Sequence, residues 1–252
     1  MPEAPRLQLR DLSKSFGSVE ALRGAAFEVR RGEVMALVGD NGAGKSTLIK
    51  CVAGINSIDS GEILFDGKAV TIHGPKDAAR LGLEFVYQDL ALCDNLDVVQ
   101  NMYLGREEHD PAYRLREAPM EQRTTETLAS LSVTTIRSVR QPVATLSGGQ
   151  RQSVAVARAV MWNSQVVFLD EPTAALGVAQ TRQVLDLVKR LAEQGLAVVI
   201  VSHNLTDVFE VADRITVLRL GQTVGVYEKD KTNAQEIVQA ITSGKPATSE
   251  AA

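Results

Sequence analysis

A glycine-rich loop between a short apolar run and a helix constrains the fold of this chain more than any other feature. The run is Val-Met-Ala-Leu-Val over residues 34–38, and the loop is Gly-Asp-Asn-Gly-Ala-Gly-Lys-Ser over residues 39–46. A helix is expected over residues 47–53, closed by Gly54. The pattern Gly-x-x-x-x-Gly-Lys-Ser between a buried strand and a helix is typical of a phosphate-binding P-loop, because glycines let backbone N–H groups approach phosphate oxygens. The alternative is a glycine-rich strand-to-helix turn without a ligand.

Each part of this loop has an expected role if a nucleotide binds there. Lys45 would neutralise charge on the β and γ phosphates, and the Ser46 hydroxyl would reach Mg²⁺. The following helix adds its positive N-terminal end. The nucleotide-binding residues predicted from the loop are Gly39, Asn41, Gly42, Ala43, Gly44, Lys45, Ser46 and Thr47.

Two carboxylates follow a second apolar run, Val-Val-Phe-Leu over residues 166–169. Ligands of open α/β sheets bind at the carboxyl ends of the strands. Asp170 is suited to hold Mg²⁺, directly or through its water. Glu171 points elsewhere and is suited to orient or deprotonate an attacking water. The alternative is a strand end that carries acidic, solvent-facing residues.

A second motif, Ser147-Gly148-Gly149-Gln150, opens a predicted helix that runs to Val160. Ser147 is a good N-cap, and the glycines expose N–H groups at the positive helix end. Glycine weakens a helix by about 1 kcal/mol relative to alanine, so an anion at this end would account for the pair. The alternative is an ordinary capped helix. One nucleotide needs only one P-loop, so we expect ATP to be held between two copies of the domain, head to tail.

The remaining hydrophobic pattern predicts an α/β fold. In the first third of the chain, Gly17 and Gly24 mark turns between short strands, and Asp66-Gly67 indicates a hairpin. Residues 89–162 are predominantly helical and polar, and we interpret them as an inserted helical subdomain. β-branched runs then return the chain to a core buried on both faces. The expected strands cover residues 7–9, 25–29, 34–38, 166–169, 197–201, 214–219 and 223–227.

Composition narrows the class of partner. The 252 residues are 44% hydrophobic, which is ample for a full core, and the net charge of −4 gives no electrostatic footprint for nucleic acid. Cys51 and Cys93 have no metal-type spacing and favour a reduced, cytosolic chain. We see no secretory signal and no apolar run near the roughly 20 residues that cross a bilayer. A membrane role would therefore be that of a peripheral subunit.

The order of the motifs resembles one family. Leu146-Ser147-Gly148-Gly149-Gln150 resembles the signature motif of ABC ATPases, and the resemblance extends over residues 5 to 240. Phe16 looks like the adenine-stacking aromatic, Gln88 like the Q-loop glutamine, and His203 like the switch histidine. The motifs stand in the family's order and approximate spacing.

The resemblance gives these three residues roles that each lacks when taken alone. Phe16 would offer a π-face to the base; otherwise it is a core aromatic. Gln88 would contact Mg²⁺ and the water and tie the helical subdomain to the nucleotide state; otherwise it is a solvated loop residue. His203 would hydrogen-bond the γ-phosphate and orient Glu171; otherwise it satisfies a backbone carbonyl at a strand end.

The resemblance implies a P-loop NTPase core with a mixed sheet, an N-terminal antiparallel β subdomain and an inserted helical subdomain. Residues 1–88 and 163–242 would form the RecA-like ATP-binding core, and residues 89–162 the inserted part. Residues 243–252 are expected to be a disordered tail.

The sequence departs from the family at Ala174-Ala175-Leu176-Gly177, where an aspartate usually occupies the last position. That carboxylate contacts the partner's P-loop in the family, so its loss puts communication between the two ATP sites in doubt. The same four residues are similar to those found in the monosaccharide-importing branch of the family. Asp40, Asn41 and the stretch 87–92 also look like that branch.

The resulting hypothesis is an ATP-hydrolysing ABC importer subunit that takes up a small solute, with a monosaccharide favoured. Catalysis would use Glu171, His203, Gln88 and Lys45; Mg²⁺ would be held by Ser46, Gln88 and Asp170; and the signature residues Ser147, Gly148, Gly149 and Gln150 would bind ATP from the other copy. The expected partners are a second copy, integral membrane permease subunits that dock near residues 89–104, and indirectly an extracellular or periplasmic sugar-binding protein. The expected location is the cytoplasmic face of the inner membrane.

Two alternatives stay open at this point. One is a soluble ABC-type ATPase that acts on nucleic acid or ribosomes, which copurifying molecules would reveal. The other is a switch that binds ATP without turnover, against which the presence of Glu171 and His203 argues. The sequence does not name the sugar, the permease or the pairing of the two cassettes, nor the effect of Gly177.

Overall fold

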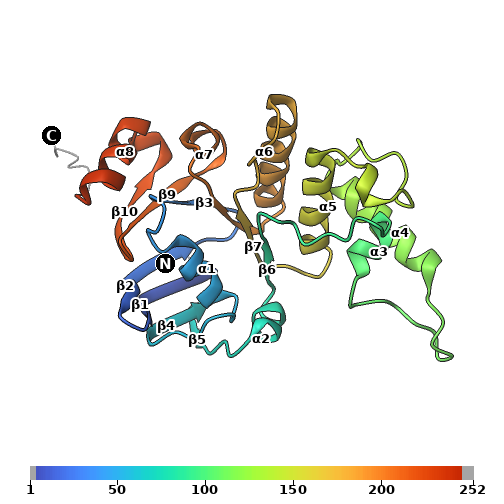
Figure 1. Cartoon of the computed structure of the whole chain (residues 1–252), viewed down its shortest axis with the longest axis horizontal. Helices are drawn as coiled ribbons and strands as arrows, with labels where there is room; N and C mark the ends of the chain where they lie inside the picture. Colours follow the sequence, from blue (N-terminus) through green and yellow to red (C-terminus); the bar gives the residue numbers. More distant parts are fainter. Residues whose placement is uncertain (1–3, 246–252) are drawn as a thin grey trace.

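The chain forms two sheets flanked by helices in the computed structural model, which describes residues 4–245 (Figure 1). The first sheet has four strands in the order β2-β1-β4-β5, all antiparallel. The second has six strands in the order β10-β9-β3-β8-β7-β6, in which only the β9–β10 pair is antiparallel. The strands are β1 (Leu7–Phe16), β2 (Val19–Val29), β3 (Val34–Val38), β4 (Ser60–Phe65), β5 (Lys68–Val70), β6 (Leu83–Val86), β7 (Val166–Asp170), β8 (Ala197–Val201), β9 (Arg214–Arg219) and β10 (Gln222–Glu228).

The helices cover the six-stranded sheet and extend the molecule to one side of it. The α-helices are α1 (Lys45–Val52), α2 (Pro75–Arg80), α3 (Val98–Tyr103), α4 (Glu117–Ser130), α5 (Gly148–Val160), α6 (Val178–Glu193), α7 (Leu205–Val211) and α8 (Ala234–Ser243), and two 3₁₀ turns cover Val143–Thr145 and Lys229–Lys231. Helices α3, α4 and α5 lie together at the end of the molecule away from α8 (Figure 1). Within residues 4–245, none of the helices has the length and apolar character that a bilayer crossing needs.

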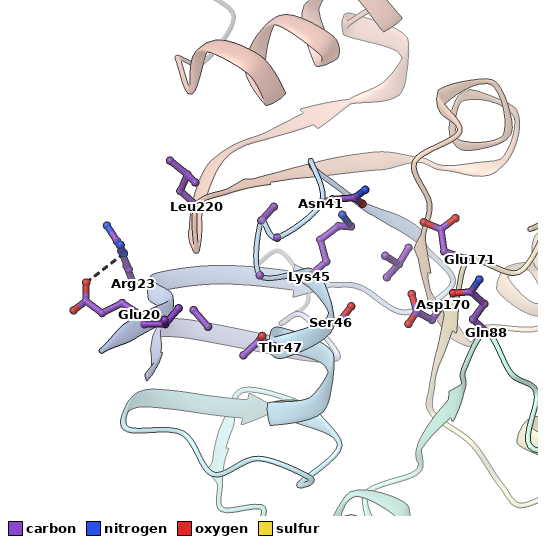
Figure 2. A pocket seen from close by; sticks show the side chains of 16 residues that line it. Glu20, Arg23, Asn41, Lys45, Ser46, Thr47, Gln88, Asp170, Glu171 and Leu220 are labelled. Atoms are coloured by element: carbon purple, nitrogen blue, oxygen red, sulfur yellow. Dashed lines mark ion pairs between the residues drawn. The ribbon is translucent and has the colours of Figure 1, made fainter. Parts of the chain in front are cut away.

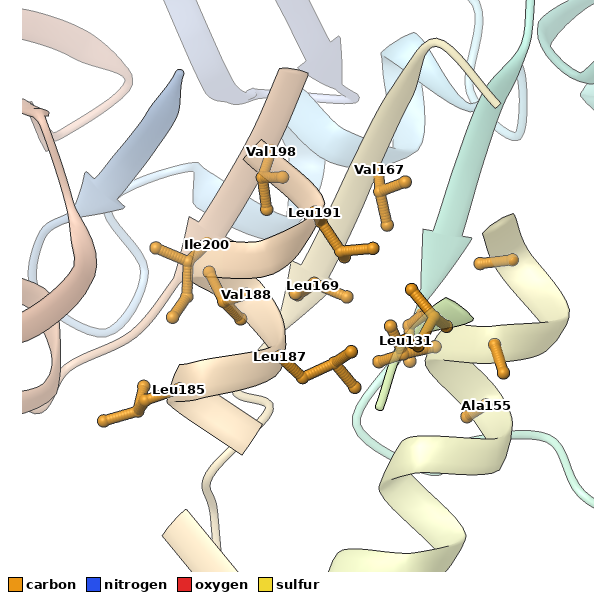
Figure 3. Close-up of a cluster of buried hydrophobic side chains, with 14 of the residues drawn as sticks. Leu131, Ala155, Val167, Leu169, Leu185, Leu187, Val188, Leu191, Val198 and Ile200 are labelled. Carbon is orange, nitrogen blue, oxygen red and sulfur yellow. The ribbon is translucent and has the colours of Figure 1, made fainter. Parts of the chain in front are cut away.

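The central strands are buried on both faces, and alternate residues face different cores. Val34, Ala36 and Val38 pack into one cluster, whereas Met35 and Leu37 belong to another. The first cluster joins the sheet to α6 and α5; its members include Val167, Leu169, Val198 and Ile200 of the sheet, Leu185, Leu187, Val188 and Leu191 of α6, and Ala155 of α5 (Figure 3). The second joins the sheet to α1 and to the antiparallel sheet. The continuous apolar runs therefore act as the middle layer of the fold.

The helical region shares the first cluster with the sheet. Val98 and Met102 of α3 and Val154 of α5 are buried in the same cluster as Val167 of β7. The division of the chain at residues 89 and 162 stays a prediction, because a shared core joins the two parts. Inside the helical region the buried Asn101 bonds three backbone carbonyls, which fixes the chain before α3.

Several element bounds differ from the sequence-based expectations. Strands β1 and β2 extend to the Gly17 turn, and Gly24 lies inside β2 at a register irregularity instead of in a turn. Its N–H bonds the Ser13 hydroxyl of β1 at 2.9 Å, which compensates for the broken ladder. Helix α1 begins at Lys45, inside the predicted loop. Ser243, assigned to a disordered tail, is the last residue of α8, and Gly244 is its C-cap; residues 246–252 of that predicted tail lie outside the described residues.

Candidate functional site

A cavity of about 520 Å³ lies where the glycine-rich loop faces the carboxyl end of β7. Figure 2 shows Asn41 and Lys45 of the loop opposite Asp170, Glu171 and Gln88. The described residues that line the cavity are Val19, Glu20, Ala21, Arg23, Asn41, Gly42, Ala43, Gly44, Lys45, Ser46, Thr47, Gln88, Asp170, Glu171, Val201 and Leu220. Residues far apart in the sequence thus surround one space, as the sequence predicts for the loop, the acidic pair and Gln88.

The shape of the loop requires glycine where other backbone comes close. A Cβ on Gly39 would lie 2.1 Å from the carbonyl oxygen of Leu218, and one on Gly44 would lie 2.7 Å from that of Ala21. Both distances are shorter than side chains tolerate. The loop is therefore packed against β9 and β2.

Lys45 crosses the loop that carries it. Its Nζ donates to the carbonyl oxygens of Gly39 at 2.7 Å and Asp40 at 3.0 Å. An ammonium has three N–H groups, so these two bonds leave one for an anion in the cavity. Burial lowers the pKa of Lys45, and the nearby carboxylates of Glu171 and Asp170 oppose that shift. An anion beside the ammonium would likewise favour its charged form.

Asp170 and Glu171 leave the end of β7 in different directions. Glu171 has a φ of 50°, which is unusual for a residue with a side chain, and its N–H donates to the Val201 carbonyl at 2.8 Å. Burial, with a further contribution from the neighbouring Glu171, raises the pKa of Asp170. A divalent cation would relieve that unfavourable pair of negative charges.

His203 follows β8 and reaches Glu171 from outside the cavity lining. Its Nδ1 lies 2.9 Å from Oε1 of Glu171. The His203 side chain is 74% exposed and that of Glu171 is 17% exposed, so the imidazole is largely in solvent and the carboxylate largely buried. The two residues are neighbours because β7 and β8 are adjacent parallel strands.

Phe16 does not line the cavity. It ends β1, pairs with Val19 across the Gly17 turn, and is 48% exposed. The Nζ of Lys14 lies 5.5 Å from the centre of its ring. Phe16 is thus on the hairpin that supplies one wall of the cavity, and one face of its ring is already in contact with a cation.

Ser147, Gly148, Gly149 and Gln150 are not among the residues that line this cavity. Ser147 caps α5 in a reciprocal arrangement: its N–H donates to Oε1 of Gln150 at 2.8 Å, and its hydroxyl accepts from the Gln150 N–H at 3.4 Å. The Gln150 side-chain amide also donates to the Thr135 carbonyl at 2.6 Å. Bonds within the same chain therefore occupy both the oxygen and the nitrogen of the Gln150 side-chain amide.

Helix packing gives a reason for the two glycines that the sequence did not reveal. A Cβ on Gly149 would lie 3.0 Å from Cβ of Gln180, and one on Gly148 would lie 3.0 Å from a methyl group of Leu176. The start of α6 thus approaches the start of α5 closely. An anion at this helix end is one explanation of the glycine pair, and close packing is a second.

Sequence reasoning missed part of the cavity wall. Val19, Glu20, Ala21 and Arg23 of β2, and Leu220 of the β9–β10 turn, carry no motif. Gly221 is the sequence feature that could have indicated this wall, because a Cβ at that position would lie 2.7 Å from the Ala21 carbonyl oxygen. Glycine in that turn marks the close approach of β2, but the sequence alone does not say what approaches it.

The oxygen-bearing residues at the cavity suit a magnesium ion better than a softer metal. Ser46, Gln88 and Asp170 offer a hydroxyl, an amide and a carboxylate, all at the cavity wall. Magnesium prefers oxygen ligands and completes its shell with water and phosphate. Across residues 4–245, His, Cys, Asp and Glu form no group of three or more that could hold a metal by itself.

Comparisons with known proteins agree with this geometry. The family model described as ABC transporter matches residues 22–174. The chain is 46% identical to the xylose/arabinose import ATP-binding protein of Sulfolobus acidocaldarius over 94% of both chains, and 44% identical to the fructose import ATP-binding protein of Rhizobium meliloti over 100% of this chain and 99% of that one. It is 40% identical to a ribose import ATP-binding protein of Escherichia coli O157:H7, of which it covers 48%.

Solved structures show the same fold. A nucleotide-free ATP-binding cassette of an ABC transporter superposes with a TM-score of 0.80 at 24% identity, covering 95% of this chain and 96% of that one. A cassette of an ABC transporter in its ADP conformation gives 0.79 at 25% identity, covering 95% of each chain. A dimeric bacterial cassette gives 0.74 at 24% identity, covering 88% of this chain and 98% of the other.

Proposed function

This chain belongs to the ABC transporter ATP-binding family, and on that premise we propose that it is the ATPase subunit of a monosaccharide importer. The observation that carries the ATPase activity is the meeting of Lys45, Asp170 and Glu171 around one cavity. Import and the sugar class come from the relatives, which are named for the import of xylose or arabinose, fructose and ribose. A soluble ATPase that acts on nucleic acid or ribosomes is not favoured, because those relatives are import proteins.

ATP would bind with its phosphates in the glycine-rich loop. The N–H groups of the first turn of α1 and the free donor of Lys45 would surround the β and γ phosphates. Ser46, Gln88 and Asp170 would hold Mg²⁺, which neutralises charge on the β and γ phosphate oxygens. The Phe16 ring, on the hairpin beside the cavity, would support the base. Its second face would be the one that stacks, because Lys14 lies over the other.

Glu171 is in position to act on the water that attacks the γ-phosphate. A general base must lie within hydrogen-bond reach of the proton that it accepts, and the Glu171 side chain enters the cavity opposite Lys45 (Figure 2). The contact with His203 would help to orient the carboxylate. Gln88 would contact the water and Mg²⁺ from the same side.

A second copy of the chain would complete each ATP site. Ser147 and the two glycines after it lie outside the cavity of their own chain, so they can act on a nucleotide only from a neighbour. We infer a head-to-tail pair with ATP between the loop of one copy and the α5 N-terminus of the other. A similar bacterial cassette is dimeric in its solved structure, which supports a pair of chains.

The permease would dock beside α3, on the surface predicted from residues 89–104. A groove of about 170 Å³ opens there, and Met102, Leu104 and Trp162 are among the residues that line it. Leu104 is 48% exposed, an apolar side chain available to a partner. The subunit would work at the cytoplasmic face of the membrane, and a sugar-binding protein would deliver solute to the permease from the other side.

Purification of the tagged chain from detergent-solubilised membranes tests this function. We expect an integral membrane protein to copurify, and the reconstituted assembly to hydrolyse ATP faster with a monosaccharide and its binding protein than without. Copurification of ribosomes or nucleic acid in place of a membrane protein would overturn the importer. If the wild-type chain hydrolyses ATP no faster than a Glu171→Gln preparation, the proposed ATPase activity is overturned.

A further inference from the structure

The turn that follows Gln88 holds two consecutive residues in the left-handed region. Leu90 has a φ of 57° and Ala91 a φ of 45°. Side chains with a Cβ rarely adopt this conformation, and two in succession are less favourable still. Local bonds from Leu90 N–H to the Tyr87 carbonyl (2.9 Å) and from Ala91 N–H to the Asp89 carbonyl (2.7 Å) shape the turn. Strained turns persist where their surroundings hold them.

Arg158 of α5 holds this turn by hydrogen bonds to the backbone carbonyls of Leu90 and Ala91. Its Nη1 donates to the Ala91 carbonyl at 2.8 Å and its Nη2 to the Leu90 carbonyl at 3.0 Å. The planar guanidinium matches two adjacent acceptors in a way that a lysine ammonium does not. The nearby Glu84 carboxylate accepts a hydrogen bond from Arg106 at 3.3 Å. Arg158 donates instead to the two carbonyls of the turn.

The Arg158 guanidinium is partly removed from water for this purpose. Burial lowers the pKa of Arg158, and the nearby Glu84 carboxylate opposes that shift. Removing a guanidinium from water is unfavourable unless its N–H groups are bonded. The two carbonyls therefore compensate for its burial, and the arginine in turn fixes the strained turn.

The turn has a second attachment to the same helix. Arg151, two turns before Arg158 on α5, forms an ion pair with Asp94. Residues 90–94 are thus fastened to α5, while Gln88 just before them lines the nucleotide cavity with Asp170 and Glu171. The α5 helix begins at the Ser147 cap.

We propose that Arg158 is a positioning residue for Gln88: it fixes the Leu90–Ala91 turn so that the amide of Gln88 reaches the reacting phosphate and its water. The inference rests on the proposed ATPase function and adds a residue that lies outside the cavity. A shift of the turn would move Gln88 without changing the loop that binds the nucleotide. The loss should therefore appear in turnover and leave nucleotide affinity nearly unchanged.

The test is a double-mutant cycle on the whole chain, with ATP turnover and nucleotide affinity measured for each variant. Arg158→Lys keeps the charge but cannot bridge both carbonyls, and we expect kcat to fall on the order of tenfold, within the coupling range of residues in one network. KM and ATP affinity should stay within about twofold. In a Gln88→Ala background the same change should have no further effect, because the residue that it positions is gone.

Arg123→Lys is the matched control. Arg123 of α4 also donates to a backbone carbonyl, that of Met161 at 3.0 Å, in the same helical region but away from Gln88. It should leave kcat unchanged. A role of Arg158 in stability alone would lower activity by the same factor with and without Gln88, and that result overturns the proposal.

A second variant covers the case in which Arg158→Lys fails to fold. Ala91→Gly removes the Cβ that makes a φ of 45° unfavourable, so it should stabilise the turn and reduce its dependence on Arg158. Arg158→Lys should therefore fold and turn over ATP better in this background than alone, and no improvement would overturn the proposal. If the wild-type chain is no more active than Glu171→Gln, the ATPase function fails first, so the two failures are distinguishable.

Discussion

Nδ1 of His203 lies 2.9 Å from Oε1 of Glu171, and this contact joins the ends of two neighbouring parallel strands. A neutral imidazole has one N–H donor and one acceptor nitrogen. His203 can therefore donate to Glu171 and to a phosphate oxygen at the same time only with both nitrogens protonated. If His203 contacts the γ-phosphate as proposed, it would link that phosphate to the Glu171 carboxylate.

Glu171→Gln is expected to retain ATP binding and to lose hydrolysis. The amide keeps the shape of the side chain but cannot accept a proton, so turnover should fall on the order of 10²-fold or more. ATP should then trap a dimer, measurable by size-exclusion chromatography with and without nucleotide. Near-normal hydrolysis in this variant would remove Glu171 from the role of base.

Ser147→Arg is expected to act only on the neighbouring copy. The substitution places a bulky cation at the α5 N-terminus, outside the cavity of its own chain. Binding of a fluorescent ATP analogue to the monomer should be unchanged while hydrolysis is blocked. Mixing it with a Lys45→Ala chain, whose signature end is intact, should restore one working site. Loss of binding by the Ser147→Arg monomer would contradict this geometry.

Gly177→Asp restores the acid that the sequence lacks, and the structure has room for it. Gly177 is the N-cap of α6 with φ −74° and ψ 162°, and a Cβ there would meet nothing within 4 Å. Aspartate is a better cap than glycine by a few tenths of a kcal/mol, so stability to urea should rise slightly. If the carboxylate also contacts the partner, the Hill coefficient for ATP should increase; an unchanged coefficient would make the glycine neutral for communication. Gly177→Ala is the control without a carboxylate.

Gly44→Ala and Gly42→Ala separate backbone strain from steric contact. Both glycines have positive φ, but only the Cβ on Gly44 would meet a neighbour, the Ala21 carbonyl at 2.7 Å. Gly44→Ala should therefore destabilise the protein by about 1–3 kcal/mol more than Gly42→Ala and abolish ATP binding. Thermal unfolding and nucleotide titration measure the two effects. Equal losses from both substitutions would mean that strain alone governs the loop.

Cys51 is expected to react slowly with thiol reagents in the folded protein. It lies in α1, directly after the glycine-rich loop, and is 1% exposed. Burial raises its pKa, so less thiolate is present at neutral pH, and reactivity should increase as pH rises toward that pKa. Labelling in a Cys93→Ser background should follow unfolding, and ATP should slow it by stabilising the folded state. Rapid labelling of the native protein would show that α1 opens independently.

The sequence by itself determined the chemistry of the cavity and the layers of the fold. Residues 34–38 and 197–201 form β3 and β8 with the predicted bounds. A short, continuous apolar run rich in β-branched residues is typical of a strand buried on both faces. The glycine-rich loop, Asp170 and Glu171 stand out by residue type and spacing, since each chemical role needs a particular side chain, whereas Gln88 was identified only from the resemblance to the family. The predicted strands over residues 7–9 and 25–29 are shorter than β1 and β2, because residues 13–20, where the two strands meet at the turn, contain few apolar side chains.

Tertiary structure alone decided which backbone and side chains meet these residues. The wall from Val19 to Arg23 and the Leu220 turn has no motif, because any side chain of suitable size can line a cavity. Gly149 packs against Gln180 of α6, and Arg158 of α5 bonds the turn after Gln88; these contacts join residues 31 and 67 or more positions apart. Local patterns encode local conformation, whereas such contacts depend on how whole helices pack, which no short stretch of sequence specifies.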